Sequence, residues 1–285
     1  MTVRQRPGRP ANASPGGLGE RDISGMLFTA EMYGVQLDLL AAVLDGTVPR
    51  ARAAATRWRR LGYADSGRLG PGASWVWLTR AGLAACGLRY APIQPALPRL
   101  AHIRAVTAVR LALAGTGTYQ QAGAYWRGER RLRARGRPGL REHLPDGEVH
   151  WPDSAPVPWA GECWAIEAEL TRKTVRRTTA IMRELLTRTG DYGCAAAEAS
   201  VPGRLPRHAR ALYVCSPGAR PTVLRARAAL GPLATRLEVR DLPAASALEG
   251  AAPSAGHGLP ALAGHGEPGA DGGERPGADG GERPC

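Results

Sequence analysis

The sequence has very little lysine. Of its 38 basic residues, only Lys173 is a lysine and the other 37 are arginine. No apolar run approaches the roughly 20 residues that span a bilayer. The N-terminal segment is polar and rich in proline and glycine, with no secretion signal. These absences predict a cytoplasmic protein with no membrane partner.

Other familiar chemical signatures are also missing. The five cysteines are odd in number and show no Cys-x-x-Cys spacing, which predicts reduced, buried thiols and neither a zinc site nor a disulfide framework. No glycine-rich phosphate loop occurs, so we expect no nucleotide cofactor. His102, His143 and His150 share no metal-ligand spacing and are predicted to be core or surface histidines.

The charge and composition divide the chain into segments. A net charge of +13 favours a polyanionic partner, most simply double-stranded DNA. Near the C-terminus the octapeptide PGADGGER occurs twice in tandem, and such composition cannot bury enough apolar surface to become ordered. The predicted boundaries are disorder at 1–20, one domain over 21–90, a linker over 91–99, a second domain over 100–245 and a disordered tail over 246–285.

The first predicted domain begins with three helices. Asp22 can cap the first, the second runs from Leu37 to Leu44, and Thr47 caps the third, from Pro49 to Leu61. The third helix contains no acid. Its five arginines are Arg50, Arg52, Arg57, Arg59 and Arg60.

A hairpin follows the three helices. A Gly/Pro/Ser loop over 66–74 carries Arg68 and leads into a short strand from Trp75 to Leu78. Three helices followed by a two-stranded hairpin with a basic tip predict a winged helix, whose third helix enters the major groove of DNA. The alternative is a solvated, arginine-rich helix face without a ligand.

The second predicted domain has the order α-β-β-β-α-β, which predicts an α/β sandwich around a mixed sheet. The whole chain is therefore expected to be of the α+β class. The predicted elements are a helix over 100–113, strands over 124–132, 144–149 and 163–170, a helix over 173–187, a strand over 211–215, a helix over 221–230 and a strand over 237–239.

The third strand of this domain carries two acids. Glu167 and Glu169 should point to one face, about 7 Å apart, because side chains alternate along a strand. Thr171 can cap the next helix, which would place Lys173 in its first turn, near both acids. Asp146 would come from the adjacent strand. Lysine, unlike arginine, has a tunable pKa, although an ordinary surface lysine remains an alternative.

Glu129 is expected on the first strand of the same sheet, between Gly128 and Arg130. It could add a third acid to this group as a metal ligand. It could equally pair with the arginines beside it.

This arrangement resembles the PD-(D/E)XK nuclease pattern. The resemblance implies that Asp146 and Glu167 hold Mg²⁺ or Mn²⁺ and that a lysine activates water or stabilises the transition state. Glu169 stands where that lysine is expected, so Lys173 would have to serve instead.

The span from Arg21 to Leu242 more specifically resembles the replication-relaxation family of actinobacterial and plasmid-borne proteins. The resemblance implies a role in plasmid replication or in nicking and relaxing plasmid DNA. The phrases that carry it are LTRAG at 78–82, LAH at 100–102, WRGERRL at 126–132, HLPDG at 143–147 and WAIEAELTRK at 164–173.

Two hypotheses of function remain. In the first, the protein is a divalent-metal-dependent DNA endonuclease or nickase delivered by its winged helix. In the second, it is a non-catalytic replication or transcription regulator whose nuclease-like domain serves for pairing, which leaves a homodimer open. The glutamate at position 169 favours the second hypothesis, and the single lysine favours the first.

Overall fold

The computed structural model describes residues 17–135, 142–190 and 206–243. The predicted tail over 246–285 and most of the predicted disordered N-terminus lie outside these residues. Within them, helices combine with one small antiparallel sheet and one larger mixed sheet, so the expected α+β class is confirmed. No helix among the described residues is long and apolar enough to cross a membrane.

The N-terminal part builds helices around a three-stranded sheet of order β1-β3-β2, in which both pairings are antiparallel. Thr79 caps the last helix, where its hydroxyl accepts a hydrogen bond from the Gly82 amide. The elements are α1 (Glu20–Glu31), β1 (Val35–Gln36), α2 (Leu37–Val43), α3 (Val48–Arg60), β2 (Ala64–Gly67), β3 (Trp75–Leu78) and α4 (Arg80–Ala85).

Asp22 has a different role from the predicted helix cap. The cap of α1 is Gly19, and Asp22 in the first turn accepts the Gly19 amide at 3.2 Å. Its other oxygen accepts the indole N–H of Trp58 at 2.8 Å and pairs with Arg57. Asp22 therefore ties α1 to α3, because its buried carboxylate finds its donors on that helix.

The C-terminal part is built on a five-stranded sheet of order β4-β5-β6-β7-β8. The first two pairings are antiparallel and the last two parallel, as the predicted mixed sheet required. The elements are η1 (Leu97–Arg99), α5 (Leu100–Ala114), α6 (Gly117–Gln121), β4 (Tyr125–Gly128), α7 (Glu129–Arg135), β5 (Gly147–His150), β6 (Cys163–Glu169), α8 (Val175–Thr187), β7 (Arg210–Cys215), α10 (Arg220–Ala228), η2 (Gly231–Arg236) and β8 (Leu237–Asp241).

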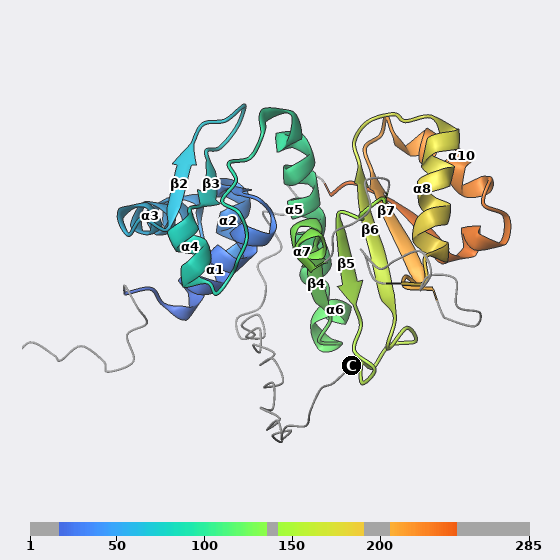
Figure 1. Cartoon of the computed structure of the whole chain (residues 1–285), viewed down its shortest axis with the longest axis horizontal. Helices are drawn as coiled ribbons and strands as arrows, with labels where there is room; N and C mark the ends of the chain where they lie inside the picture. Colours follow the sequence, from blue (N-terminus) through green and yellow to red (C-terminus); the bar gives the residue numbers. More distant parts are fainter. Residues whose placement is uncertain (1–16, 136–141, 191–205, 244–285) are drawn as a thin grey trace, which may run out of the picture. The chain divides into compact units, whose positions relative to one another are not determined.

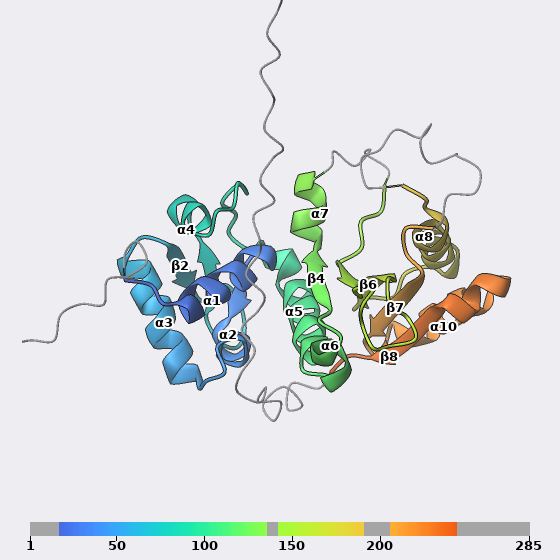
Figure 2. The ribbon, with the colours of Figure 1, turned by 90° about the horizontal axis from the view of Figure 1, so that it is seen from below.

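Helices cover both faces of the five-stranded sheet. Figures 1 and 2 show α5 on one face and α8 with α10 on the other. The alternation along β6 explains this arrangement: Ile166 and Ala168 join the core that contains Val106 of α5, whereas Ala165 joins the core that contains Met182 of α8. The central strand is therefore buried on both sides.

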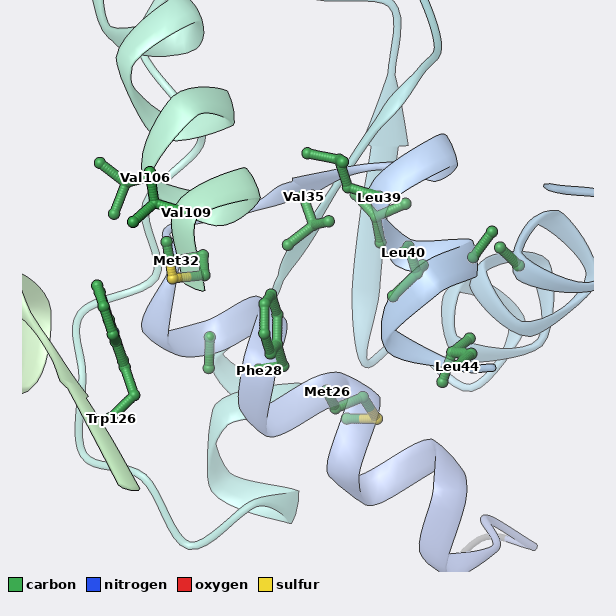
Figure 3. Close-up of a cluster of buried hydrophobic side chains, with 14 of the residues drawn as sticks. Met26, Phe28, Met32, Val35, Leu39, Leu40, Leu44, Val106, Val109 and Trp126 are labelled. Carbon is green, nitrogen blue, oxygen red and sulfur yellow. The ribbon is translucent and has the colours of Figure 1, made fainter. Parts of the chain in front are cut away.

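One hydrophobic core joins the N-terminal elements to α5 and β4. Figure 3 shows Met32, the residue that follows α1, near Val106 and Val109 of α5, and these residues share one buried cluster with Phe28 of α1 and Trp126 of β4. The buried guanidinium of Arg130 donates to the Ala30 carbonyl at 2.6 Å. These contacts cross the boundary that the sequence suggested near residues 91–99.

Two predicted elements have different bounds in the structure. The strand predicted over 124–132 ends at Gly128, and Glu129 begins helix α7 instead of lying on the strand. The helix predicted to be capped by Thr171 is capped by Thr174, whose hydroxyl accepts the Arg177 amide at 3.2 Å. Lys173 therefore precedes the helix and does not lie in its first turn.

Replacing Asp22 by alanine tests the connection between α1 and α3. Removing its buried, charge-assisted hydrogen bonds should lower the free energy of unfolding by about 1–3 kcal/mol, measured by urea denaturation. Asp65→Ala is the control, because Asp65 is exposed on β2. Equal midpoints for the two variants would contradict this role of Asp22.

Candidate active site and nucleic-acid interface

Strand β6 places Glu167 and Glu169 on a buried face of the sheet. Each residue is only 6% exposed. In the parallel register they stand beside Tyr213 and Cys215 of β7, which belong to the same core as Ala165. As predicted, the two acids share one face, but that face is interior and covered by helices.

Asp146 lies immediately before β5, not within a strand as predicted. Its Oδ2 accepts the Ala168 amide of β6 at 2.8 Å, and its Oδ1 lies 2.7 Å from His102 Nε2. The side chain takes the place of a backbone acceptor at this end of the β5–β6 ladder, so the strand pairing starts only at Gly147. Asp146 is thereby fixed next to the end of β6 that bears the glutamates.

Lys173 folds back to the acids from the segment between β6 and α8. Its Nζ lies 2.6 Å from Glu169 Oε2, and the side chain is 29% exposed. The charge of Lys173 also acts on Glu167. Lys173 thus reaches the cluster from a position before the helix, although the cap that was expected to direct it there is Thr174.

Glu167 carries the most perturbed carboxyl group of this cluster. Burial, followed by the negative charge of Asp146, raises its pKa from the ordinary value of 4.5 to about 7. The hydrogen bond and charge of His143, and the charge of Lys173, act in the opposite direction without cancelling the effect. Asp146, Glu167, Glu169 and Lys173 therefore form one electrostatically connected group, hereafter the acid cluster.

Sequence reasoning missed the two histidines that contact this group. His143 Nε2 lies 2.7 Å from Glu167 Oε1, and His102 pairs with Asp146. The pKa of His102 is raised chiefly by its hydrogen bond to Asp146. For His143, burial lowers the pKa but the bond and charge of Glu167 outweigh it. Both histidines lie in phrases that carry the family resemblance, His102 in LAH and His143 in HLPDG, and this could have indicated a place near the acids.

Glu129 lies beside the acid cluster but is held by arginines. Its carboxylate pairs with Arg99 at 2.8 Å and with Arg133 at 2.6 Å, and its amide donates to the Asp146 carbonyl. Burial raises the pKa of Glu129, but the bonds from these two arginines outweigh it and lower the pKa overall. Of the two roles predicted for Glu129, its contacts match pairing with arginines, although the partners differ from its chain neighbours.

The arginines predicted to contact DNA are not equivalent. Arg57 is half-buried and paired with Asp22. The others are all exposed and form no ion pair with a described carboxylate: Arg50, Arg52, Arg59 and Arg60 on α3, and Arg68 in the segment between β2 and β3. The exposed arginines of α3 lie away from its buried face, which is formed by Ala51, Ala54, Ala55 and Trp58.

The acid cluster has the ligand chemistry for a hard divalent cation, but among the described residues only Glu148, Cys163 and His208 bring three ligand atoms within 4.8 Å of one another. Asp146, Glu167 and Glu169 offer carboxylate oxygens, which Mg²⁺ and Mn²⁺ prefer. The raised pKa of Glu167 means that its negative charge is only partly compensated by the residues around it. A bound cation would supply the missing compensation.

A second group with metal-ligand atoms is already neutralised. Glu148, Cys163 and His208 bring one such atom each within 4.8 Å of the others. Both oxygens of Glu148 are bound by Arg207, one also by His208 at 2.8 Å and the other by His150 at 2.9 Å. Burial raises the pKa of Glu148, but these donors hold it far below its usual range. The guanidinium supplies the charge that a metal would bring, so this network ties β5 to the start of β7.

The pH dependence of stability tests the burial of Glu167. Burying a carboxyl group whose pKa is raised by folding costs no stability while the group is protonated, below its unfolded pKa. The protein then loses stability as the pH rises from the unfolded pKa to the folded one, which for Glu167 means from about 4.5 to about 7. The free energy of unfolding of Glu167→Gln, relative to that of the native protein, should therefore increase by up to about 3 kcal/mol from pH 5 to pH 8. Urea unfolding at each pH measures this difference. A difference that stays constant across this range would contradict the raised pKa.

No protein-family model matches the chain, and no curated protein matches its sequence. The resemblance to the replication-relaxation family therefore rests on the sequence phrases that carry it, and the function that it implies is a proposal.

Proposed function

We propose that the protein binds DNA in the replication of a plasmid or mobile element and nicks or relaxes that DNA with a divalent metal. The observation that carries the proposal is the acid cluster, in which two buried glutamates, an aspartate and the single lysine of the chain meet at one end of a sheet. Buried carboxylates with a raised pKa are typical of functional sites.

The N-terminal elements support delivery to DNA. Their order, α1-β1-α2-α3-β2-β3, and the sheet order β1-β3-β2 are those expected of a winged helix, with α3 as the recognition helix. Four exposed arginines on α3 and Arg68 near the hairpin tip offer phosphate and base contacts. The order α5-β4-β5-β6-α8-β7, in which α6 and α7 are inserted, supports the proposal of a nuclease-like domain.

Each member of the acid cluster has a role that follows from its contacts. Asp146 and Glu167, with Glu169, would hold the cation, which when bound polarises the phosphoryl oxygens. His102 and His143 orient Asp146 and Glu167 through their hydrogen bonds. Lys173, beside Glu169, is placed to donate a proton to the leaving oxygen or to stabilise negative charge on phosphate.

A non-catalytic regulator is the second candidate, and one observation favours it. Both oxygens of Asp146 already accept hydrogen bonds, from the Ala168 amide and from His102. Lys173 is likewise already paired with Glu169. Such internal pairing would also suit a nuclease-like fold that serves only for protein association.

Incubation of supercoiled plasmid with the pure protein and Mn²⁺ or Mg²⁺ tests the first candidate. Open-circular product should form, and Lys173→Arg should slow its formation about 100-fold or more, because a guanidinium does not replace a tunable ammonium. Arg176→Lys is the matched control: it exchanges the same side chains in the reverse direction at an exposed neighbouring position. Cleavage that persists in Asp146→Ala and Glu167→Ala would refute the nuclease assignment.

DNA affinity as a function of salt tests the arginine face of α3. Changing Arg59 and Arg60 together to alanine should weaken duplex binding and lower the slope of log K against log salt by about 0.9 for each phosphate that these arginines neutralise. Arg57 is left intact because it pairs with Asp22. The control variant combines Arg176→Ala and Arg183→Ala on α8, which removes the same two positive charges from another helix. Equal effects of the two double substitutions would mean that binding follows net charge and not α3.

A further inference from the structure

Strand β8 forms one edge of the five-stranded sheet. It pairs in parallel with β7 on one side, and no described strand pairs with its other side (Figure 2). Of its five residues, Glu238, Arg240 and Asp241 are exposed and Val239 is half-buried. An exposed strand edge presents unpaired backbone groups, which can pair with the strand of another chain.

The backbone groups that point outward follow from the pairing of β8 with β7. The Leu242 amide donates to the Cys215 carbonyl at the end of β7, at 3.0 Å. Successive residues of a strand direct their N–H and C=O groups to opposite edges, so the even-numbered residues of β8 bond to β7. Val239 and Asp241 therefore direct their amides and carbonyls away from the sheet. These groups form no hydrogen bond with any described residue.

The sequence of β8 is complementary to itself in the antiparallel direction. If Val239 lies opposite the partner's Val239 across a two-fold axis, each Glu238 faces the partner's Arg240, and each Asp241 faces the partner's Leu237. The two Val239 residues exchange two backbone hydrogen bonds, and each Asp241 amide donates to a Leu237 carbonyl. The Glu238 and Arg240 side chains occupy positions without backbone hydrogen bonds, where opposite side chains lie closest.

Charge selects this register among the alternatives. A two-fold axis at Glu238, at Arg240 or at Asp241 would place two like charges directly opposite each other, which is destabilising. An axis at Leu237 would need extended backbone before β8. The preceding segment is the 3-10 helix η2, and the Leu237 amide is already bonded to the Ala234 carbonyl. Only the axis at the central residue of β8 brings opposite charges together on extended backbone.

Glu238 and Arg240 have capacity for a second partner. Within one copy they pair at 2.6 Å, but their side chains remain 49% and 50% exposed. Such an exposed pair contributes little to the stability of a single copy. Charged side chains on an edge strand can also serve to exclude other strands. Here the two charges are of opposite sign on one face, so they repel a shifted copy and attract a copy in the register centred on Val239.

We propose that β8 is a homodimer interface in which the edge strands of two copies pair in antiparallel fashion about a two-fold axis at Val239. The two five-stranded sheets then form one continuous sheet. The partner is a second copy of this chain, bound through the outward backbone groups and the reciprocal pairs of Glu238 with Arg240. This interface is independent of the proposed action on DNA, and its test uses neither DNA nor a metal.

Charge reversal tests the reciprocal pairs, with self-association of the full-length protein measured by sedimentation equilibrium. The native protein should form a concentration-dependent dimer. Glu238→Arg places two arginines opposite each other and Arg240→Glu places two glutamates opposite each other, so each should weaken the dimer about 100-fold or more. The controls are Asp65→Arg and Arg176→Glu, which make the same changes in net charge at exposed positions outside β8, and they should dimerise as the native protein does.

Mixing the two variants separates the interface from effects within one copy. Every contact between a Glu238→Arg chain and an Arg240→Glu chain joins an arginine to a glutamate, so an equimolar mixture should form a heterodimer with about the native affinity. Loss of the pair within one copy is not repaired by mixing. A mixture that stays monomeric overturns the proposal.

Val239→Pro tests the backbone bonds. It removes an outward amide that does not bond to β7, and proline is tolerated on an edge strand at such a position. The dimer should therefore be lost, while the melting temperature of dilute protein stays close to the native value. A native protein that sediments as a monomer throughout the micromolar range, or a dimer that persists in Val239→Pro, would show that β8 is not the interface. Should Val239→Pro not fold, the mixture of charge variants still decides the outcome.

Discussion

Carboxylates on the buried face of a strand are removed from the water that stabilises their charge, and β6 puts Glu167 and Glu169 in this position. Two neighbouring side chains compensate in part for the missing hydration. Lys173 turns back to Glu169, and His143 comes to Glu167 from the segment before β5. The pKa of Glu167 nevertheless stays high, so these partners do not fully replace hydration. The charge of the acid cluster is therefore only partly compensated within the described residues.

The same face of the sheet offers a comparison. Glu148 on β5 is also completely buried, yet its carboxylate receives Arg207 on both oxygens as well as His208 and His150. Its pKa falls, whereas that of Glu167 rises. Burial is common to both acids, so the difference comes from the donors. Arg207 and two histidines make Glu148 part of a structural network, whereas no arginine of the described residues pairs with Glu167.

The sequence predicted the parts that depend on local periodicity. Alternation placed Glu167 and Glu169 on one face of β6, where the structure has them. The sequence-based prediction of strand bounds failed where a side chain takes the place of a backbone hydrogen-bond partner. Asp146 accepts the Ala168 amide and so lies outside the strand predicted to contain it. Thr171 and Thr174 are both acceptable caps by residue type, and the helix begins after Thr174. Contacts such as His102 to Asp146 join residues 44 positions apart, which no local pattern reveals.

The use of lysine at one position only follows from what surrounds it. Every basic residue of this chain other than Lys173 and the histidines is an arginine, and paired ones such as Arg57 and Arg207 direct their forks to one or two carboxylate oxygens. Lys173 pairs with a buried carboxylate and also lines a shallow depression together with Arg172 and Arg225. A compact ammonium can approach Glu169 to 2.6 Å and keep further donors for a second acceptor. A guanidinium would direct its rigid fork to the carboxylate and hold a permanent charge. A lysine at position 173 therefore satisfies Glu169 with one donor and leaves its other donors available.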